Sequence, residues 1–228
     1  MLNSLFHHFD NIVTLDTETT GFSAFSEEII EYGGVRLQKG AVSTKDTTDL
    51  NLLIRLSKGK RLPPKIVELT GITDAQLTSE GVDKKHAAEH IAAQLSGDRT
   101  LIVAYNAQFD LLFLYHFLKS FRLDICLRRA HFLDALTVYR DRRPYPHKLI
   151  DAIGAYGVDE ENSHRATDDA KATVAVLDAM EREKPDLISY VDIFGYNPKF
   201  GAPKPHEAIT RITYKPQDGR DVLPLWKK

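Results

Sequence analysis

The order of strand-like and helix-like segments is the feature that most limits how this chain can fold. Alternating and continuous apolar runs predict three N-terminal strands, at about residues 12–16, 28–37 and 50–54. Further along, helical patterns at about 82–95 and 107–121 flank the apolar run Leu101–Tyr105, which is typical of a strand at the centre of a sheet. A meander followed by alternating helices and strands predicts one mixed α/β sheet covered by helices.

Charge and proline are distributed unevenly along the chain. The 228 residues carry 30 Lys+Arg against 32 Asp+Glu, a formal net charge of −2, so no overall positive field attracts polyanions. Residues 194–228 nevertheless hold five of the ten prolines and seven basic against three acidic residues. We predict an enzyme-sized domain over 1–184 and a Pro-rich basic extension over 185–228, either wrapped on the domain or trailing from it, with a short hairpin around 209–214.

Cysteine usage and hydropathy indicate where the protein resides. The one cysteine, Cys126, cannot form an internal disulfide, which favours a reducing, cytoplasmic setting. No apolar stretch approaches the ~20 residues that span a bilayer, and the N-terminus lacks the basic flank and apolar run of an export signal. We therefore expect a cytoplasmic protein with no membrane partner.

Two carboxylates stand at the end of the first predicted strand. Residues i and i+2 of a strand share a face with Cα atoms ~6.5–7 Å apart, so Asp16 and Glu18 converge on one spot. Carboxylates this close repel unless one is protonated or a cation lies between them, and hard cations such as Mg²⁺ and Mn²⁺ take oxygen ligands. An isolated Asp-x-Glu pair is equally typical of exposed loop acids.

Further acidic positions fall where helices begin. Asp110 follows the strand at 101–105, near the edge where open α/β sheets place ligands. Asp168 and Asp169 occupy the first turn of a helix predicted over about 167–183, and His164 lies just ahead of it. The helix dipole alone favours acids in a first turn. It does not explain the histidine, a residue type whose ordinary pKa of ~6.5 suits proton transfer near neutrality.

Taken together, these residues form three ordered motifs: Asp16-Thr17-Glu18-Thr19-Thr20-Gly21, Tyr105-Asn106-Ala107-Gln108-Phe109-Asp110 and His164-x-Ala166-x-x-Asp169-Ala170. In this order and spacing the set resembles the DEDDh branch of the DnaQ-like 3′-to-5′ exonucleases, over about residues 10–183. The segment from Leu62-Pro63-Pro64 to Ile72-Thr73 resembles one typical of the bacterial proofreading-subunit type. The resemblance implies a ribonuclease-H-like fold, with a five-stranded mixed sheet flanked by helices and the site at its strand ends.

The resemblance implies that four carboxylates bind two divalent metal ions, Mg²⁺ or Mn²⁺: those of Asp16, Glu18, Asp110 and Asp169. It makes His164 the general base. The family pattern puts the last carboxylate five residues after the histidine, which leaves Asp168 as a helix cap or supporting acid. A related branch with a catalytic tyrosine would need Tyr where Arg165 stands. Tyr105 occupies a position often held by His in the family, and we expect this departure to adjust the activity rather than abolish it.

The resemblance also implies that five residues seat the terminal nucleotide: Thr19, Thr20, Gly21, Phe22 and Asn106. Gly21 would allow close backbone approach, and Phe22 would stack or wedge at a base, with a place in the core as its alternative. Phosphate tracking needs local positive charge. Two basic groups could provide it or form solvated faces, and they are Lys58, Lys60 and Arg61, and Arg122, Arg128, Arg129, Arg140, Arg142 and Arg143.

Two bound divalent cations would change the formal charge from −2 to about +2, so near-neutral composition does not exclude a nucleic-acid enzyme. The leading hypothesis is a 3′-to-5′ exonuclease that releases nucleoside 5′-monophosphates from single-stranded or frayed DNA 3′ ends, in proofreading or repair, with a DNA polymerase as candidate partner. Three alternatives stay open. One is a 3′-to-5′ exoribonuclease with the same site residues, and another is a non-catalytic module that binds nucleic-acid ends or a polymerase. The third is that the extension after residue 184 is the main partner-binding element.

Overall fold

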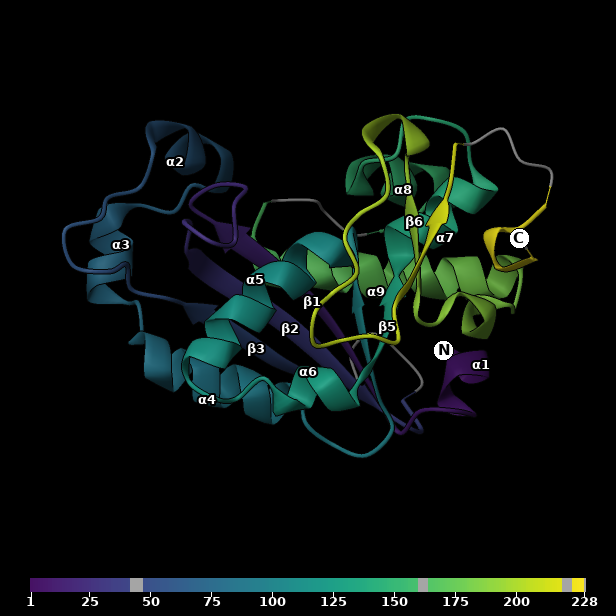
Figure 1. Ribbon diagram of the computed structural model, residues 1–228, viewed down its shortest axis with the longest axis horizontal. Coiled ribbons are helices and arrows are strands. Elements are labelled where there is room, and N and C mark those ends of the chain that lie inside the picture. The colour runs from purple at the N-terminus through teal and green to yellow at the C-terminus, as the bar shows by residue number, and fades with distance from the viewer. Residues whose placement is uncertain (42–46, 160–163, 219–222, 228) are drawn as a thin grey trace.

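A five-stranded mixed sheet forms the centre of the molecule (Figure 1). The computed structural model describes residues 1–41, 47–159, 164–218 and 223–227. The strands are β1 (Asn11–Thr19), β2 (Ile29–Gln38), β3 (Thr47–Leu53), β4 (Thr100–Ala104) and β5 (His131–Asp134), in the spatial order β3-β2-β1-β4-β5. The pairs β3-β2 and β2-β1 are antiparallel, and β1-β4 and β4-β5 are parallel. The predicted five-stranded mixed sheet is confirmed.

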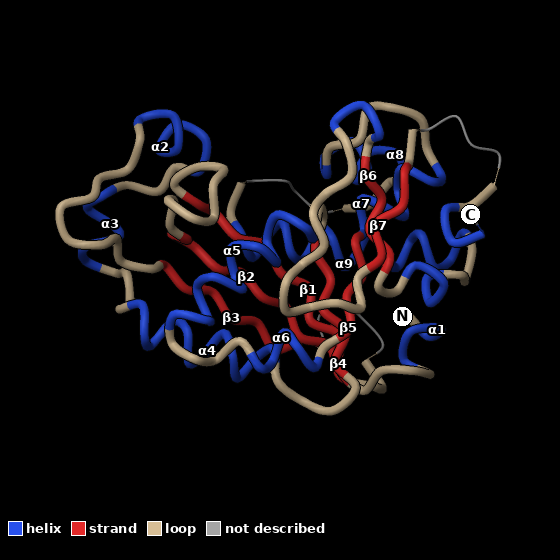
Figure 2. The backbone as a smooth tube through the Cα atoms, viewed as in Figure 1, coloured by secondary structure: helices blue, strands red, loops and turns tan. Residues whose placement is uncertain are grey.

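Helices cover both faces of this sheet, as Figure 2 shows. In chain order they are α1 (Asn3–Phe6), α2 (Pro64–Thr70), α3 (Asp74–Ser79), α4 (Lys84–Leu95), α5 (Ala107–Ser120), α6 (Ile125–Arg129), α7 (Ala135–Arg142), α8 (Leu149–Tyr156) and α9 (Ala166–Glu183). Buried side chains of α4, α5 and α6 pack with Val13 and Leu15 of β1 on one face. Those of α7, α8 and α9 pack with Ile12 on the other face. Alternation along β1 therefore divides the core into two layers.

A missing side chain brings α9 close to the sheet. Gly33 of β2 lies opposite Asp16 in the strand register. A Cβ atom at Gly33 would lie 2.1 Å from the backbone nitrogen of Thr167, which real Cβ atoms do not tolerate. The first turn of α9 can therefore approach β1 and β2 directly, at the point where β1 carries its acidic residues.

The C-terminal extension packs on the domain. It contains η1 (Leu187–Tyr190), β6 (Ile193–Tyr196), η2 (Pro198–Phe200), β7 (Thr213–Pro216) and η3 (Leu225–Lys227). Phe194, Ile209 and Ile212 are buried in the cluster that also contains α5 side chains. The predicted hairpin at 209–214 is wrong, because β7 pairs in parallel with β6. A parallel pair needs a long connection and leaves no local turn signal in the sequence.

In the described parts of the chain, no helix has the length and apolar character needed to cross a membrane.

Candidate active site

The C-terminal end of β1 provides two carboxylates and positions a third. Asp16 and Glu18 share their alternation with Ile12, so they lie on the face of the sheet that α9 covers. Thr17, between them, belongs to the opposite face, where its Oγ1 donates a 2.7 Å hydrogen bond to Oδ1 of Asp110 in the first turn of α5. This bond joins the end of β1 to the start of α5.

An ion pair between a fully buried glutamate and a partly exposed arginine holds the start of α9 against β2. Glu31 is fully buried and lies opposite Glu18 in the strand register. Its carboxylate accepts hydrogen bonds from Nη2 of Arg165, at 2.7 Å, and from the backbone nitrogen of Ala166, at 3.1 Å. Because Arg165 and Ala166 lie between His164 and Asp169, these bonds determine where both of those residues stand.

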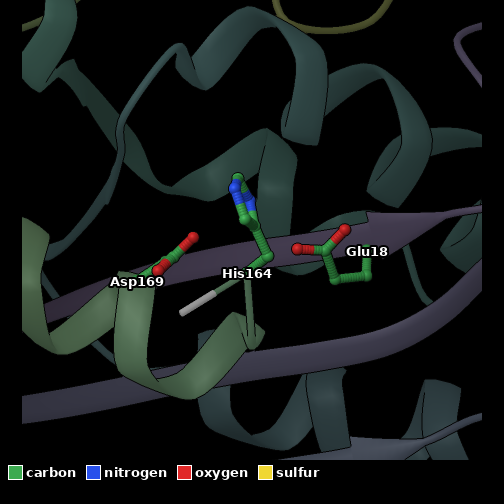
Figure 3. A group of neighbouring side chains, drawn as sticks. All are labelled: Glu18, His164 and Asp169. Atoms are coloured by element: carbon green, nitrogen blue, oxygen red, sulfur yellow. The ribbon is translucent and has the colours of Figure 1, made fainter. Parts of the chain in front are cut away.

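Three predicted site residues from distant parts of the chain converge at this point. Glu18, His164 and Asp169 each place one possible ligand atom within 4.8 Å of the other two (Figure 3). They come from β1, from the segment just before α9 and from the first turn of α9. The backbone of His164 is left-handed, with φ of 53°, a conformation uncommon for a residue of this size and frequent at functional sites.

Asp16 and Asp110 lie next to this group and interact with it electrostatically. Burial, and then the negative charges of Asp110, Glu18 and Asp169, raise the pKa of Asp16 well above its ordinary value. Burial is also the main cause that raises the pKa of Glu18 to about 8 and the pKa of Asp110 to about 7, although the hydrogen bond from Thr17 opposes the latter shift. Four clustered carboxylates and an imidazole form a donor set that suits a hard divalent cation.

These shifts predict how the stability of the metal-free protein depends on pH. Both raised pKa values belong to acids, so the contribution of Glu18 and Asp110 to folding is complete below their unfolded values of ~4. It is lost progressively as the pH rises from there to about 7 for Asp110 and about 8 for Glu18. We therefore expect the melting temperature measured in a chelator to fall across this range, and added Mg²⁺ to raise it more at about pH 8 than at about pH 5.

A variant isolates this effect from other titrating groups. Glu18→Gln cannot ionise, so its melting temperature in chelator should fall less between the two pH values than that of the wild type. Equal pH dependence in the variant and the wild type would show that the carboxylate cluster does not control the stability of the metal-free protein.

A second prediction concerns the ion pair beneath α9. Glu31→Ala removes the buried partner of this pair and leaves Arg165 without its counterion. Because Arg165 is partly exposed, the cost is smaller than for a fully buried pair, and we expect the free energy of unfolding to fall by about 2 kcal/mol. Urea denaturation measures this change. Glu89→Ala is the matched control, because the Glu89 side chain is about half exposed and its ion pair with Lys85 spans 3.9 Å. Equal stability of the two variants would contradict the proposed anchoring role.

Four of the five residues predicted to seat a nucleotide, Thr19 to Phe22, lie at the end of β1 and in the loop that follows it. The hydroxyl of Thr19 donates to the carbonyl of Gly21 at 2.7 Å, and that of Thr20 donates to Glu27 at 2.5 Å. Both hydroxyls therefore hold the loop in place. Phe22 is 91% exposed, so the alternative of a core role for Phe22 is wrong.

The start of α5 depends on a residue that sequence reasoning missed. Asp134, at the end of β5, accepts hydrogen bonds from the backbone nitrogens of Asn106 and Ala107 at 3.0 and 3.1 Å, and from the hydroxyl of Thr137 at 2.5 Å. Asn106 is exposed and has a left-handed backbone, with φ of 73°. Asp134 thus satisfies backbone donors at the turn that leads to Asp110. An acid directly before a helical segment was the available signal.

Glu31 and Arg165 were also missed as a structural pair. The signal was a glutamate inside the apolar strand segment Ile29-Ile30-Glu31-Tyr32, because a charged residue in a buried strand needs a partner. Nothing local in the sequence indicates that the partner is Arg165, which lies 134 positions further along the chain.

The structure also shows the environment of the remaining positions singled out from the sequence. Asp168 is exposed whereas Asp169 is buried. The hydroxyl of Tyr105 donates a hydrogen bond to the carbonyl of His147, in the segment before α8, at 3.0 Å.

Several members of the two basic groups form ion pairs, namely Lys60 with Glu28, Arg128 with Asp124, Arg142 with Asp186 and Arg143 with Glu183. Except for Arg128, whose partner is the N-cap of its own helix, these basic side chains join different segments of the chain.

The sequence also matches known proteins. The exonuclease family RNase_T matches residues 13–177. The PolC-type DNA polymerase III of Clostridium perfringens is 28% identical over 194 residues, which are 84% of this chain and 12% of that protein. A putative bifunctional exonuclease/endonuclease of Mycobacterium tuberculosis is 32% identical over 179 residues, which are 74% of this chain and 26% of that protein.

Solved structures support the same fold. The zinc-bound E. coli ExoI–ssDNA complex superposes with a TM-score of 0.66 at 20% identity, over 80% of this chain and 42% of that one. The predicted ribonuclease-H-like fold is confirmed by this similarity, although the chain spans less than half the length of each of these proteins. Exonucleases of this kind use divalent metals. Because the family match covers most of the sequence, the chain belongs to the DnaQ-like exonuclease family.

Proposed function

We propose that this protein is a metal-dependent 3′-to-5′ exonuclease that releases nucleoside 5′-monophosphates from DNA 3′ ends. The observation that carries the proposal is the convergence of Glu18, His164 and Asp169, with Asp16 and Asp110 beside them. The similarity to polymerases of the PolC type and to an ExoI complex with single-stranded DNA supports DNA as the substrate. A DNA polymerase is a candidate partner, in proofreading or repair.

The four carboxylates would hold two divalent cations, Mg²⁺ or Mn²⁺. When bound, such cations polarise the scissile phosphate, lower the pKa of a water molecule and offset the charge of the leaving 3′-oxygen. The anionic oxygens that bind these cations would come from four side chains that the fold already holds near one another, namely Asp16, Glu18, Asp110 and Asp169. Thr17 and the pair of Glu31 with Arg165 keep two of those carboxylates in place.

His164 would accept the proton of the attacking water. Its side chain is exposed while that of Asp169 is buried, so the imidazole stands on the solvent side of the cluster, where water and substrate enter. Its two ring nitrogens allow it to take up a proton and to release it to solvent after each turnover. Phe22, exposed on the adjacent loop, would contact the terminal base.

A resection assay tests this function. The substrates are 5′-labelled single-stranded DNA, duplex DNA with a mismatched 3′ end, and RNA, each with Mg²⁺ or Mn²⁺. Stepwise shortening of DNA that stops in a chelator is the expected result. Shortening of RNA alone would assign the protein to the exoribonuclease alternative. Binding of 3′ ends without cleavage of any substrate would favour the non-catalytic alternative, and loss of the 5′ label as mononucleotide would overturn the direction.

A further inference from the structure

A groove runs along the outer side of α5, beside the candidate active site. Its volume is about 390 Å³. Three parts of the chain form its walls: the loop after β1, α5 itself and the C-terminal extension, which crosses α5 between η2 and β7 (Figure 1). The wall residues that matter for the argument are Phe25, Gln108, Tyr115, His116, Lys204 and His206.

Aromatic side chains line this groove. The Phe25 side chain is 81% exposed, and its ring lies 4.6 Å from that of His116, centroid to centroid. Beside His116, the ring of Tyr115, which is buried, meets that of His206 edge-on at 4.5 Å. Exposed aromatic faces bind successive bases of single strands without regard to sequence, because every base has a π-face. An exposed phenylalanine in a groove of this size offers such a face.

The charges around the groove suit a polyanion. Lys204 is exposed at its rim, within an extension whose residues 194–228 carry a net charge of +4. Glu207 also lines the groove, but its carboxylate accepts hydrogen bonds from the amine of Lys119 at 2.7 Å and the hydroxyl of Tyr115 at 2.9 Å. Its negative charge is therefore offset within the protein, and Lys204 is left to attract a phosphate.

One end of the groove lies near the start of α5, which carries Asp110. Gln108 lies in the first turn of α5, two residues before Asp110. Phe25 belongs to the same loop as Phe22, which begins where β1 ends. None of the four carboxylates lines the groove, but Gln108 and Leu111, which flank Asp110 in the sequence, do.

We propose that the groove binds the bases of single-stranded DNA upstream of the scissile linkage, with Phe25 as a stacking residue and Lys204 as a phosphate contact. The C-terminal extension is then part of the substrate-binding surface. This inference rests on the proposed function, and it adds a subsite that the carboxylate cluster does not contain.

Steady-state kinetics of the full-length protein on two substrates tests the proposal. The long substrate is an oligothymidylate of about twelve nucleotides, which is within the usual site size of single-strand binding surfaces. The short one is the p-nitrophenyl ester of thymidine 5′-monophosphate, which occupies only the terminal-nucleotide site. For Phe25→Ala and Lys204→Glu, we expect KM for the long substrate to rise about tenfold with kcat nearly unchanged, and hydrolysis of the short substrate to stay as in the wild type.

Two matched controls come from the same extension. Phe200 is 81% exposed, as Phe25 is, and Lys199 is exposed, and neither lines the groove. Phe200→Ala and Lys199→Glu should leave KM for the long substrate unchanged. If the control and groove variants raised KM equally, the effect would come from the general charge and hydrophobicity of the surface. That outcome would overturn the proposed subsite.

A binding measurement separates this proposal from the proposed function. Fluorescence anisotropy of a labelled oligothymidylate reports the groove whether or not the protein cleaves DNA. A wild type that binds the oligonucleotide but cleaves nothing, with weaker binding by Phe25→Ala, would refute the exonuclease proposal and keep the subsite. Full activity in the wild type with unchanged KM and affinity in both groove variants would refute the subsite alone, and would leave the groove to a partner of another kind.

Discussion

Asp16→Asn should reduce 3′-end cleavage by about 10³-fold or more, the equivalent of the several kcal/mol that metal-assisted stabilisation contributes to such reactions. Burial and the charges of four other carboxylates, those of Asp110, Glu18, Asp169 and Glu31, raise the pKa of the Asp16 carboxyl, and a position of such high negative charge density is one where an anionic ligand binds a cation strongly. The amide of asparagine keeps the size of the side chain and loses its charge. Cleavage of labelled single-stranded DNA, measured in single turnovers over a range of Mg²⁺ concentrations, gives the result.

The variant should remain folded. Removing one of several mutually repelling carboxylates relieves strain, so the melting temperature of Asp16→Asn in chelator should equal or exceed that of the wild type. Asp168→Asn is the matched control, since Asp168 is acidic, exposed and adjacent to Asp169 in the sequence. More than a tenth of wild-type activity in Asp16→Asn, or an equal loss in Asp168→Asn, would contradict the assignment of ligands.

His164→Ala should lower the rate of the chemical step by about 10²- to 10⁴-fold, the usual contribution of a general base, with KM almost unchanged. A protonated imidazole cannot accept a proton, so wild-type activity should decline toward acidic pH. That decline should be weaker in the variant. Because the side chain is exposed, imidazole added to the solution should restore part of the lost activity.

The structure also allows a different role for this ring, which lies within 4.8 Å of the ligand atoms of Glu18 and Asp169. If His164 were a metal ligand, the variant would need more Mg²⁺ or Mn²⁺ for activity and would keep the acidic decline of the wild type. His90→Ala is the control, because His90 is an exposed histidine on α4. A shift in metal dependence without a change in the pH profile would remove the general-base assignment.

Local patterns along β1 and around the starts of α5 and α9 were enough to predict much of the site. Strict alternation puts Asp16 and Glu18 on one face of a strand, wherever that strand lies. Asp110 and Asp169 fall in first turns of helices, whose starts are indicated by polar residues before an apolar stripe. Such signals depend on a few neighbouring residues, so they can be interpreted without knowing the fold.

Interactions between distant segments could not be predicted in this way. Glu31 is a buried charge whose partner, Arg165, comes from another part of the chain, and Asp134 binds a turn that begins 28 positions before it. The strand β5 has only four residues, too few for a clear apolar pattern, and β6 pairs with β7 in parallel. Each of these features is stabilised by a partner that comes near only when the chain folds. The hydrophobic periodicity of the sequence carries no information about which residue that partner is.

The sequence by itself determined the residue types of the site, their faces and the order of the sheet's first strands, because these follow from side-chain alternation and from helix starts. Only the tertiary structure decided that Glu18, His164 and Asp169 meet within 4.8 Å, and that the basic extension crosses α5 to complete a groove. The physical reason is the range of the forces involved. Strand alternation is imposed by each residue's own backbone, whereas convergence of charges depends on burial and on ion pairs such as Glu31 with Arg165, which exist only once the sheet and its helices have packed together.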